Sequence, residues 1–517
     1  MQNNEYLFVP TEPVETKEQV TPQDPITENI VEDTPKKSKS KFWPVFGIVS
    51  GAVVLTGVII AIITACLSGN KYIEQETDII AFNTGFDEVI VCEDGERIDT
   101  RIPGKRSSYI SSIKGDASLL AATKNTDDEN SPKTLYYIHD EDITKIIDDV
   151  KGYRLSAEGN AALYVAGASA LSKTDFNRNE TTYITDNVGD YEISPNGSAA
   201  AYTVPGYGYT SVYYFDGKES ILIDDNFPAN STVLGLSDKG NYIYIKGNSD
   251  DVAGPLYRYT RKNNKYVKLC DNFQYLICFN YNNTQILYTE TDGATYFAEK
   301  NKDVKQISTI TVTPCISSRT GSRDRTYGIK NLCDGFYSSK EADDMCKLHY
   351  VDREGNITAL TENAIESVAA SYDGDTAYFL TSEKNLYKIK AKSYAKGTQI
   401  AQNVDFYIVS TESDQLYFLI EGNLHFGFSE FFSKEVMKEV DHIAVLDDGI
   451  CIFSSSTGSF KCRNGKDIVK MDDDKLDFFS YGNSVFYYKK TSSDMYELYG
   501  FDGEEYFELI GSSSRFY

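Results

Sequence analysis

The side chains that most often carry out chemistry are scattered in this chain of 517 residues. Its four histidines are His139, His349, His425 and His442. The sequence contains no Gly-x-Ser-x-Gly motif, no His-Glu-x-x-His motif and no phosphate-binding glycine-rich loop. It therefore predicts no catalytic residue, no metal ligand and no cofactor, and we expect a protein that is not an enzyme.

Two acidic segments are the nearest approach to a metal site. Asp447–Gly449 and Asp472–Lys475 hold carboxylates at turns, but neither has the ligand spacing of an EF-hand loop. Acidic turns of this kind are usually solvated. The net charge of −26 also argues against nucleic acid as a partner, because a nucleic acid is itself a polyanion.

The nine cysteines allow disulfides if the chain is exported. Three pairs are close in sequence, namely Cys270–Cys278, Cys333–Cys346 and Cys451–Cys462. The alternative is that many are small buried apolar residues, which the strand-like surroundings of Cys278 and Cys451 favour.

These residues must be positioned by β-hairpins, of which Tyr191–Val204 is the clearest. Tyr191 and Ile193 alternate with polar residues, as in a half-buried strand. Ser-Pro-Asn-Gly then supplies a tight turn, in which Gly197 can adopt a left-handed backbone without a steric cost. A second apolar run follows and predicts the return strand.

The same pattern recurs along the chain. Turn residues Gly159, Gly197, Gly240 and Asn283 lie 38, 43 and 43 residues apart. Further copies centre on Gly374 and Asp414, with weaker ones at Gly115, Gly449 and Asn483. A second hairpin-like piece lies between successive turns, so each unit has about four strands in about 40 residues. This period predicts an all-β domain, a β-propeller of repeated four-stranded blades, against the alternative of stacked sandwiches.

Ile193-Ser-Pro-Asn-Gly followed by Ala-Tyr resembles the WD40-like repeat of TolB-type propellers, over roughly residues 78–510. The resemblance implies a fold but not a function, because propellers have many activities. Nine or ten hairpins can be counted, so three arrangements remain open: a single large ring, two smaller rings, or one ring of about eight blades with extra hairpins.

Two further features bear on the ring. We expect the hairpin at 78–91 to complete a blade with the strands at 496–499 and 506–510, because an open sheet edge invites aggregation. The irregular segment Thr311–Met345, with Arg319, Arg323 and Arg325, is either a degenerate blade or a blade with a partner-binding insertion.

The N-terminal region has a different composition. Residues 1–41 are predicted to be a disordered, acidic and proline-rich tail ending in a lysine cluster. Residues 42–67 carry no charge and would form a helix about 39 Å long, enough to span a bilayer. Residues 68–77 would be a linker, and 78–517 the propeller domain.

The lysines before this apolar run predict a single-pass protein of the cell membrane, with a cytoplasmic N-terminus and an extracellular C-terminal domain. Ile63–Cys66 also resembles a lipoprotein cleavage site, which would anchor the chain through a lipid on Cys66 instead.

Three functional hypotheses follow. The first is a membrane-anchored binding, scaffold or sensor module at the cell envelope, with a protein or glycan ligand. The alternative is a surface enzyme acting on glycans or peptides in the propeller channel. The third, suggested by the TolB-like resemblance, is an assembly factor for other exported proteins.

Overall fold

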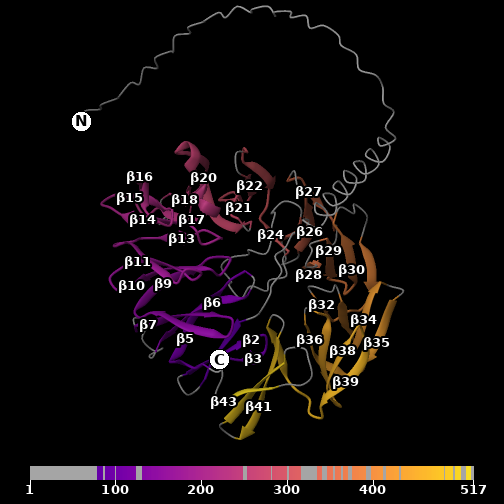
Figure 1. Cartoon of the computed structure of the whole chain (residues 1–517). Helices are drawn as coiled ribbons and strands as arrows, with labels where there is room; N and C mark the ends of the chain where they lie inside the picture. Colours follow the sequence, from indigo (N-terminus) through magenta and orange to yellow (C-terminus); the bar gives the residue numbers. More distant parts are fainter. Residues whose placement is uncertain are drawn as a thin grey trace, which may run out of the picture. The chain divides into compact units, whose positions relative to one another are not determined.

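The computed structural model of the chain describes residues 79–84, 88–98, 100–113, 115–123, 131–247, 253–280, 282–299, 302–315, 335–340, 346–352, 355–361, 365–370, 375–391, 397–410, 415–429, 432–446, 448–481, 484–492, 495–501 and 508–513. The chain divides into two compact units, Met1–Ser68 and Gly69–Tyr517. All described residues belong to the second unit, and nearly all regular structure in them is β-strand (Figure 1).

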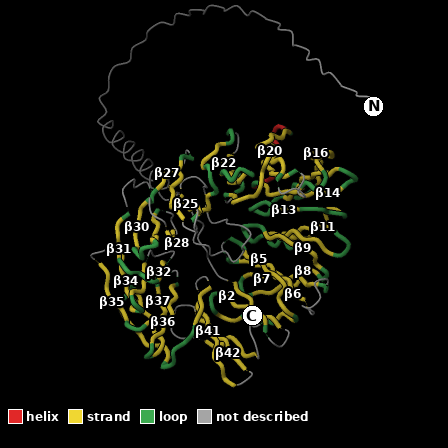
Figure 2. Tube along the Cα trace, turned by 180° about the vertical axis from the view of Figure 1, so that it is seen from behind, coloured by secondary structure: helices red, strands yellow, loops and turns green. Residues whose placement is uncertain are grey.

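The first half of the second unit contains β1 (Ile79–Asn83), β2 (Glu88–Glu93), β3 (Glu96–Arg97), β4 (Ile102–Pro103), β5 (Lys105–Ser111), β6 (Ala117–Thr123), β7 (Lys133–His139), β8 (Asp142–Ile147), β9 (Val150–Leu155), β10 (Ala161–Ala166), β11 (Ala170–Asp175), β12 (Glu180–Thr185), β13 (Tyr191–Ile193), β14 (Ala200–Pro205), β15 (Tyr209–Phe215), β16 (Ser220–Pro228), β17 (Thr232–Leu236), β18 (Tyr242–Lys246), β19 (Gly254–Thr260) and β20 (Lys265–Phe279). Two short 3-10 helices, η1 (Asp238–Gly240) and η2 (Arg261–Asn263), interrupt them (Figure 2).

The second half contains β21 (Gln285–Glu290), β22 (Thr295–Glu299), β23 (Lys305–Ser308), β24 (Val312–Pro314), β25 (Gly335–Lys340), β26 (Cys346–Val351), β27 (Ile357–Ala359), β28 (Ile365–Ala370), β29 (Thr376–Thr381), β30 (Leu386–Lys390), β31 (Thr398–Ala401), β32 (Phe406–Val409), β33 (Leu416–Ile420), β34 (Asn423–Ser429), β35 (Phe432–Met437), β36 (Val440–Val445), β37 (Ile450–Ser455), β38 (Gly458–Arg463), β39 (Lys466–Asp472), β40 (Phe478–Tyr481), β41 (Ser484–Ser492), β42 (Met495–Phe501) and β43 (Glu508–Ser513).

The strands pair antiparallel in units of four. Seven sheets are four-stranded, and the seven-stranded sheet is two such units that share the long strand β20. The eight-stranded sheet is two units joined where Cys346 of β26 pairs with Ile365 of β28. The described residues therefore form eleven consecutive units, and the predicted four-stranded repeat is confirmed.

The inner strands of each unit are buried on both faces. In β10, Ala162 and Tyr164 pack against the unit β5–β8, whereas Ala161 and Leu163 pack against the unit β13–β16. A strand between two neighbours needs apolar side chains at odd and even positions, which explains runs such as that of β6, buried at all seven positions. The fourth strands, such as β12 and β39, are mostly exposed.

Eleven apolar clusters of buried residues lie between successive units, and they close a cycle. The closing cluster joins Ile80, Phe82, Ile90 and Cys92 of the first unit to Phe486, Leu498 and Ile510 of the last. Both views show β2 beside β41 (Figures 1 and 2). This all-β arrangement of four-stranded sheets fits a β-propeller, and the described units belong to one cycle rather than two.

The predicted way of closing the cycle is wrong in one respect. The hairpin β1–β2 does not complete the last sheet, because β40–β43 already supply all four of its strands. Closure instead uses side-chain packing, including edge-to-face rings of Phe82 and Phe486 at 5.1 Å. Arg97 Nη1 also donates a hydrogen bond of 2.9 Å to the carbonyl oxygen of Ile510.

The predicted cell-membrane location is corrected here. The spanning helix predicted for 42–67, like the tail at 1–41, Cys66 and the linker, lies outside the described residues. Within the part of the chain that the structure describes, no helix is long and apolar enough to cross a bilayer.

The irregular segment Thr311–Met345 contains two strands of an ordinary unit. β24 and β25 pair with each other, and β26 and β27 complete the sheet. This supports the degenerate blade among the two alternatives. Arg319, Arg323 and Arg325 lie outside the described residues, so a partner-binding insertion stays a prediction.

Candidate functional site

The recurrent turn between the first and second strands of a unit is built around one polar side chain. In the turn after β13, Ser194 Oγ accepts a hydrogen bond of 3.0 Å from the backbone N–H of Ala199. The N–H of Gly197 donates to the carbonyl oxygen of Ser194 at 2.9 Å, with Gly197 at φ +70°. The same side-chain bond to the residue five positions on is made by Ser112, Ser156, Ser237, Asn280 and Ser410.

Turns of neighbouring units lie against one another. A Cβ atom added to Gly197 would approach Ala161 Cβ to 2.7 Å, so this turn rests on the turn of the preceding unit. Backbone Glu158 donates to the carbonyl oxygen of Pro195 at 3.0 Å, and Asn196 donates to Asp238 Oδ1 at 3.2 Å. The turns thus form a continuous polar rim across at least three units.

A pocket opens in this rim between the units that share β20. It has a volume of about 440 Å³ and is lined by Ser237, Asp238, Asn241, Tyr242, Thr260, Lys262, Asn263, Asn282 and Thr284. Three connections supply these residues: the turn after β17, the η2 segment after β19, and the turn after β20. Ligand pockets are usually lined mainly by apolar side chains, so this polar lining is unusual.

The lining offers both hydrogen-bond donors and hydrogen-bond acceptors, charged and neutral. It holds one carboxylate, one ammonium group, three amides, three hydroxyls and one phenol ring. Burial in the turn raises the pKa of Asp238 despite the hydrogen bond from Asn196 N–H. Lys262 is exposed and forms no ion pair with a described residue. A hydrogen bond links the turn after β20 to the end of β17, because Asn283 Nδ2 donates to the carbonyl oxygen of Leu236 at 3.1 Å.

A serine and a histidine meet elsewhere in the molecule. Ser339 Oγ on β25 lies 2.7 Å from His349 Nε2 on β26, within the reach expected of a nucleophile and its general base. Ser339 is only 1% exposed, so a substrate reaches it only if the neighbouring units separate. Sequence inspection missed this pair because ten residues separate its members and no motif surrounds either one.

Two carboxylates lie at the start of the unit β13–β16: Glu192 is on β13, and Asp190 directly precedes that strand. Glu192 is buried and forms an ion pair with Arg154 of β9, with Oε1 and Nε 3.1 Å apart. Asp190 Oδ2 accepts a hydrogen bond of 2.8 Å from the N–H of Val233 in β17. Burial, and then the charge of Glu192, raises the pKa of Asp190 to about 6. Both carboxylates therefore tie neighbouring units together, and their positions favour a structural role.

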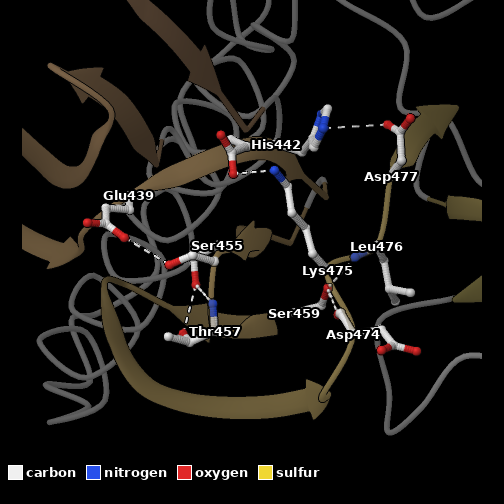
Figure 3. A network of polar contacts seen from close by, with 11 residues as sticks. Glu439, His442, Ser455, Thr457, Ser459, Asp474, Lys475, Leu476 and Asp477 are labelled. Carbon is white, nitrogen blue, oxygen red and sulfur yellow. Dashed lines mark hydrogen bonds and ion pairs between the residues drawn. The ribbon is translucent and has the colours of Figure 1, made fainter.

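The acidic segment Asp472–Lys475, the weak candidate for a calcium site, contacts the strands around it. Lys475 Nζ forms an ion pair of 2.5 Å with Asp441 Oδ2. Figure 3 shows Ser459 beside Asp474 and Leu476. Ser459 Oγ donates to the carbonyl oxygen of Asp474 at 3.0 Å, and Lys470 pairs with Asp473 at 2.7 Å. Among the described residues, no group of three or more histidine, cysteine, aspartate or glutamate side chains could hold a metal ion.

Of the predicted cysteine pairs whose members are both described, the structure brings one together and separates the other. Cys270 and Cys278 lie on the same strand, eight residues and about 26 Å apart, too far for a disulfide. Cys333 lies outside the described residues. Cys451 and Cys462 are directly opposite in the pair β37–β38, and both are free thiols.

Comparison with known proteins extends to the fold only. No family model matches the chain, and no curated protein matches its sequence. Among solved structures, the chain is similar to a prolyl endopeptidase (11% identity, TM-score 0.34, 68% of this chain and 55% of that one). It is also similar to the tricorn protease (10%, 0.29, 84% and 58%) and to a eukaryotic initiation factor (10%, 0.43, 64% and 88%). The chain thus spans little more than half the length of either peptidase.

One prediction is corrected by this comparison. Two of the three similar proteins are peptidases, so the expectation that the chain is not an enzyme is withdrawn. With these identities and TM-scores, the likeness assigns no substrate, mechanism or catalytic residue to this chain. The TolB-type resemblance likewise stands for a propeller-like fold and not for a family.

Proposed function

We propose that the protein is a ligand-binding propeller that holds a hydroxyl-rich ligand, a saccharide, in the rim pocket between the units that share β20. The observation that carries the proposal is the composition of the pocket lining. Saccharide hydroxyls donate and accept hydrogen bonds at once, and so do amide and hydroxyl side chains such as Asn241, Thr260 and Asn282. The ring of Tyr242 offers an apolar face for a sugar ring.

The two charged groups give the pocket an orientation. Asp238 accepts hydrogen bonds, whereas Lys262 only donates them, so a ligand with an ordered set of hydroxyls is held in one direction. The volume of about 440 Å³ lies in the range of small-molecule sites and suits a mono- or disaccharide.

The test is a screen of the full chain on an oligosaccharide array, followed by calorimetry with the best-bound saccharide. Lys262→Ala and Asn263→Ala should each weaken binding about tenfold, because each removes a hydrogen-bonding group of the lining. Lys218→Ala is the matched control. Lys218 is exposed in the equivalent turn of the preceding unit, which does not contribute to the pocket. Equal affinity in all three variants would refute the pocket as the binding site.

A second candidate is a hydrolase acting on peptides or esters, and it is favoured by the contact of Ser339 with His349. A fluorophosphonate probe reacts with serines that a histidine activates. The full chain should be labelled at Ser339, and Ser339→Ala should remove the label. Ser338→Ala is the control, because the neighbouring side chain of a strand points to the opposite face. An unlabelled wild-type chain would exclude this candidate.

A further inference from the structure

The hairpin β37–β38 carries two cysteines at matching positions. Cys451 and Cys462 are direct cross-strand partners, and both are buried in the cluster between the units β32–β35 and β36–β39. We propose that they are a modification site: a dithiol that a small disulfide compound reversibly converts to a cross-strand disulfide. This proposal is independent of the rim pocket and of its ligand.

The backbone already has the geometry that the bond needs. Directly opposed residues of antiparallel strands have Cα atoms about 4.5–5.5 Å apart, and disulfides span about 4.4–6.8 Å. Both side chains also lie in the same cluster of buried residues. Formation of the bond therefore requires no rearrangement of the strands.

The surroundings make one sulfur the nucleophile. Cys462 lies near Cys451, Tyr417, Gly465 and Lys434, and the N–H of Gly465 donates a hydrogen bond of 3.4 Å to the Tyr417 hydroxyl. These neighbours lower the pKa of Cys462, whereas burial raises that of Cys451. Cys462 also lies next to the turn between β38 and β39 and is 2% exposed, whereas Cys451 is 0% exposed, so Cys462 is the attacking thiol and Cys451 the resolving thiol.

Two other buried cysteines, Cys92 and Cys278, have no cysteine opposite them. Cys92 lies opposite Ile80 and Arg97, and Cys278 lies opposite Leu287. Burial raises the pKa of Cys92 to about 12 and raises that of Cys278 as well. Each would react as an isolated, poorly ionised thiol.

The reaction balances with glutathione disulfide as the oxidant. The Cys462 thiolate attacks one sulfur of the disulfide, forms a mixed disulfide and releases the first glutathione as a thiolate that takes up a proton. The Cys451 thiol then loses its proton and attacks Cys462 Sγ, which releases the second glutathione. Two protein thiols are oxidised, and one small disulfide is reduced to two thiols.

Access sets the rate of the first step. Cys462 is 2% exposed and lies next to the turn formed by Asn464 and Gly465, which joins β38 to β39. Gly465 N–H lies 3.4 Å from the Tyr417 hydroxyl, so opening this turn removes one cover of the sulfur. A small disulfide therefore reacts when the β38–β39 turn opens.

The experiment exposes the full chain to a series of glutathione disulfide to glutathione ratios, stops exchange with acid and maps cysteines by peptide mass spectrometry. The expected product is a peptide pair linked through Cys451 and Cys462, lighter by two hydrogen atoms and restored by excess thiol. Failure to form this link at any ratio, while the chain stays folded by circular dichroism, would overturn the proposal.

Single substitutions test the order of attack. Cys451→Ser should accumulate a glutathione adduct on Cys462, at least tenfold more than Cys462→Ser accumulates on Cys451. Cys92→Ser is the control and should oxidise like the wild type. Equal adduct levels in the two variants would refute Cys462 as the attacking thiol, and a link formed through other cysteines would refute the site.

Discussion

Two turns of the same kind, one in each half of the molecule, are capped by different residues. The turn after β13 and the turn after β36 both have a backbone hydrogen bond from glycine N–H to the residue three positions before it, Gly197 to Ser194 at 2.9 Å and Gly449 to Leu446 at 3.0 Å. Both glycines have positive φ, at +70° and +86°. The cap differs, because Leu446 has no side-chain acceptor.

In the second turn the cap comes from another position. Asp448 Oδ1 accepts a hydrogen bond of 3.0 Å from the N–H of Ile450, and the same carboxylate pairs with Arg463. The regular turn uses a buried serine, whereas the irregular turn uses an exposed carboxylate. The comparison teaches that backbone conformation is the strict requirement of the repeat, while the capping side chain is exchangeable.

The largest expected effect is on the glycine. Gly197→Ala combines left-handed strain of about 1–2 kcal/mol with overpacking of about 1–3 kcal/mol against Ala161. Gly293→Ala is the control, because Gly293 has φ +79° but no atom within 4 Å of an added Cβ, and it should cost only the strain. Urea unfolding measures both. Equal losses would mean that contact between turns is unimportant.

The next effect depends on pH and concerns Asp190, which ties the unit of the regular turn to its neighbour. Its pKa of about 6 in the folded chain lies above the usual value. At a pH between these two values, the carboxyl group is protonated in the folded state and ionised in the unfolded state. Stability should therefore fall by about 1–3 kcal/mol as pH rises from 4 to 6 and then level off. Asp190→Asn should remove this slope. An unchanged slope in chemical unfolding at several pH values would contradict the assignment.

The cap of the regular turn should matter less than its glycine. Ser194→Ala leaves the buried N–H of Ala199 without its acceptor and should cost about 1–2 kcal/mol. Ser194→Asn is the matched variant, because Asn280 makes the same bond in the turn after β20. Asparagine should restore most of the loss in urea unfolding. If it restores none, the two caps are not interchangeable.

The smallest effect is expected in the irregular turn. Asp448→Ala removes an exposed ion pair and an exposed cap, which together should contribute about 0.5–1 kcal/mol. The ion-pair share should shrink in 1 M salt. A loss as large as that of Ser194→Ala would show that the irregular turn depends on its cap as much as the regular one.

The sequence was informative where local chemistry sets the structure. Gly159, Gly197 and Gly240 have positive φ at turns, as their spacing indicates, and β13 and β14 pair as predicted. The unit count and the closure were less accessible. Both depend on which sheet edges stay unpaired. No local sequence pattern shows that β20 pairs with strands of two neighbouring units.

The candidate site could not be predicted from a local sequence pattern, for a related reason. Its lining comes from three connections spread over residues 237–284, each of which looks like an ordinary polar turn. Ser339 and His349 are likewise unremarkable until β25 and β26 pair. By contrast, Cys451 and Cys462 could be nominated from spacing, because a short hairpin fixes which residues face each other.

The seam between the first and last units has one more consequence. Among the described residues, no backbone ladder joins the first sheet to the last. Side-chain packing and hydrogen bonds such as that from Arg97 to Ile510 join them instead. Such a junction can open without breaking the hydrogen bonds between strands of either sheet. A circularly permuted chain, with Ile79 joined to Ser513 by a linker and new ends elsewhere, would connect the first and last units covalently. These two units should then separate less readily than in the natural chain.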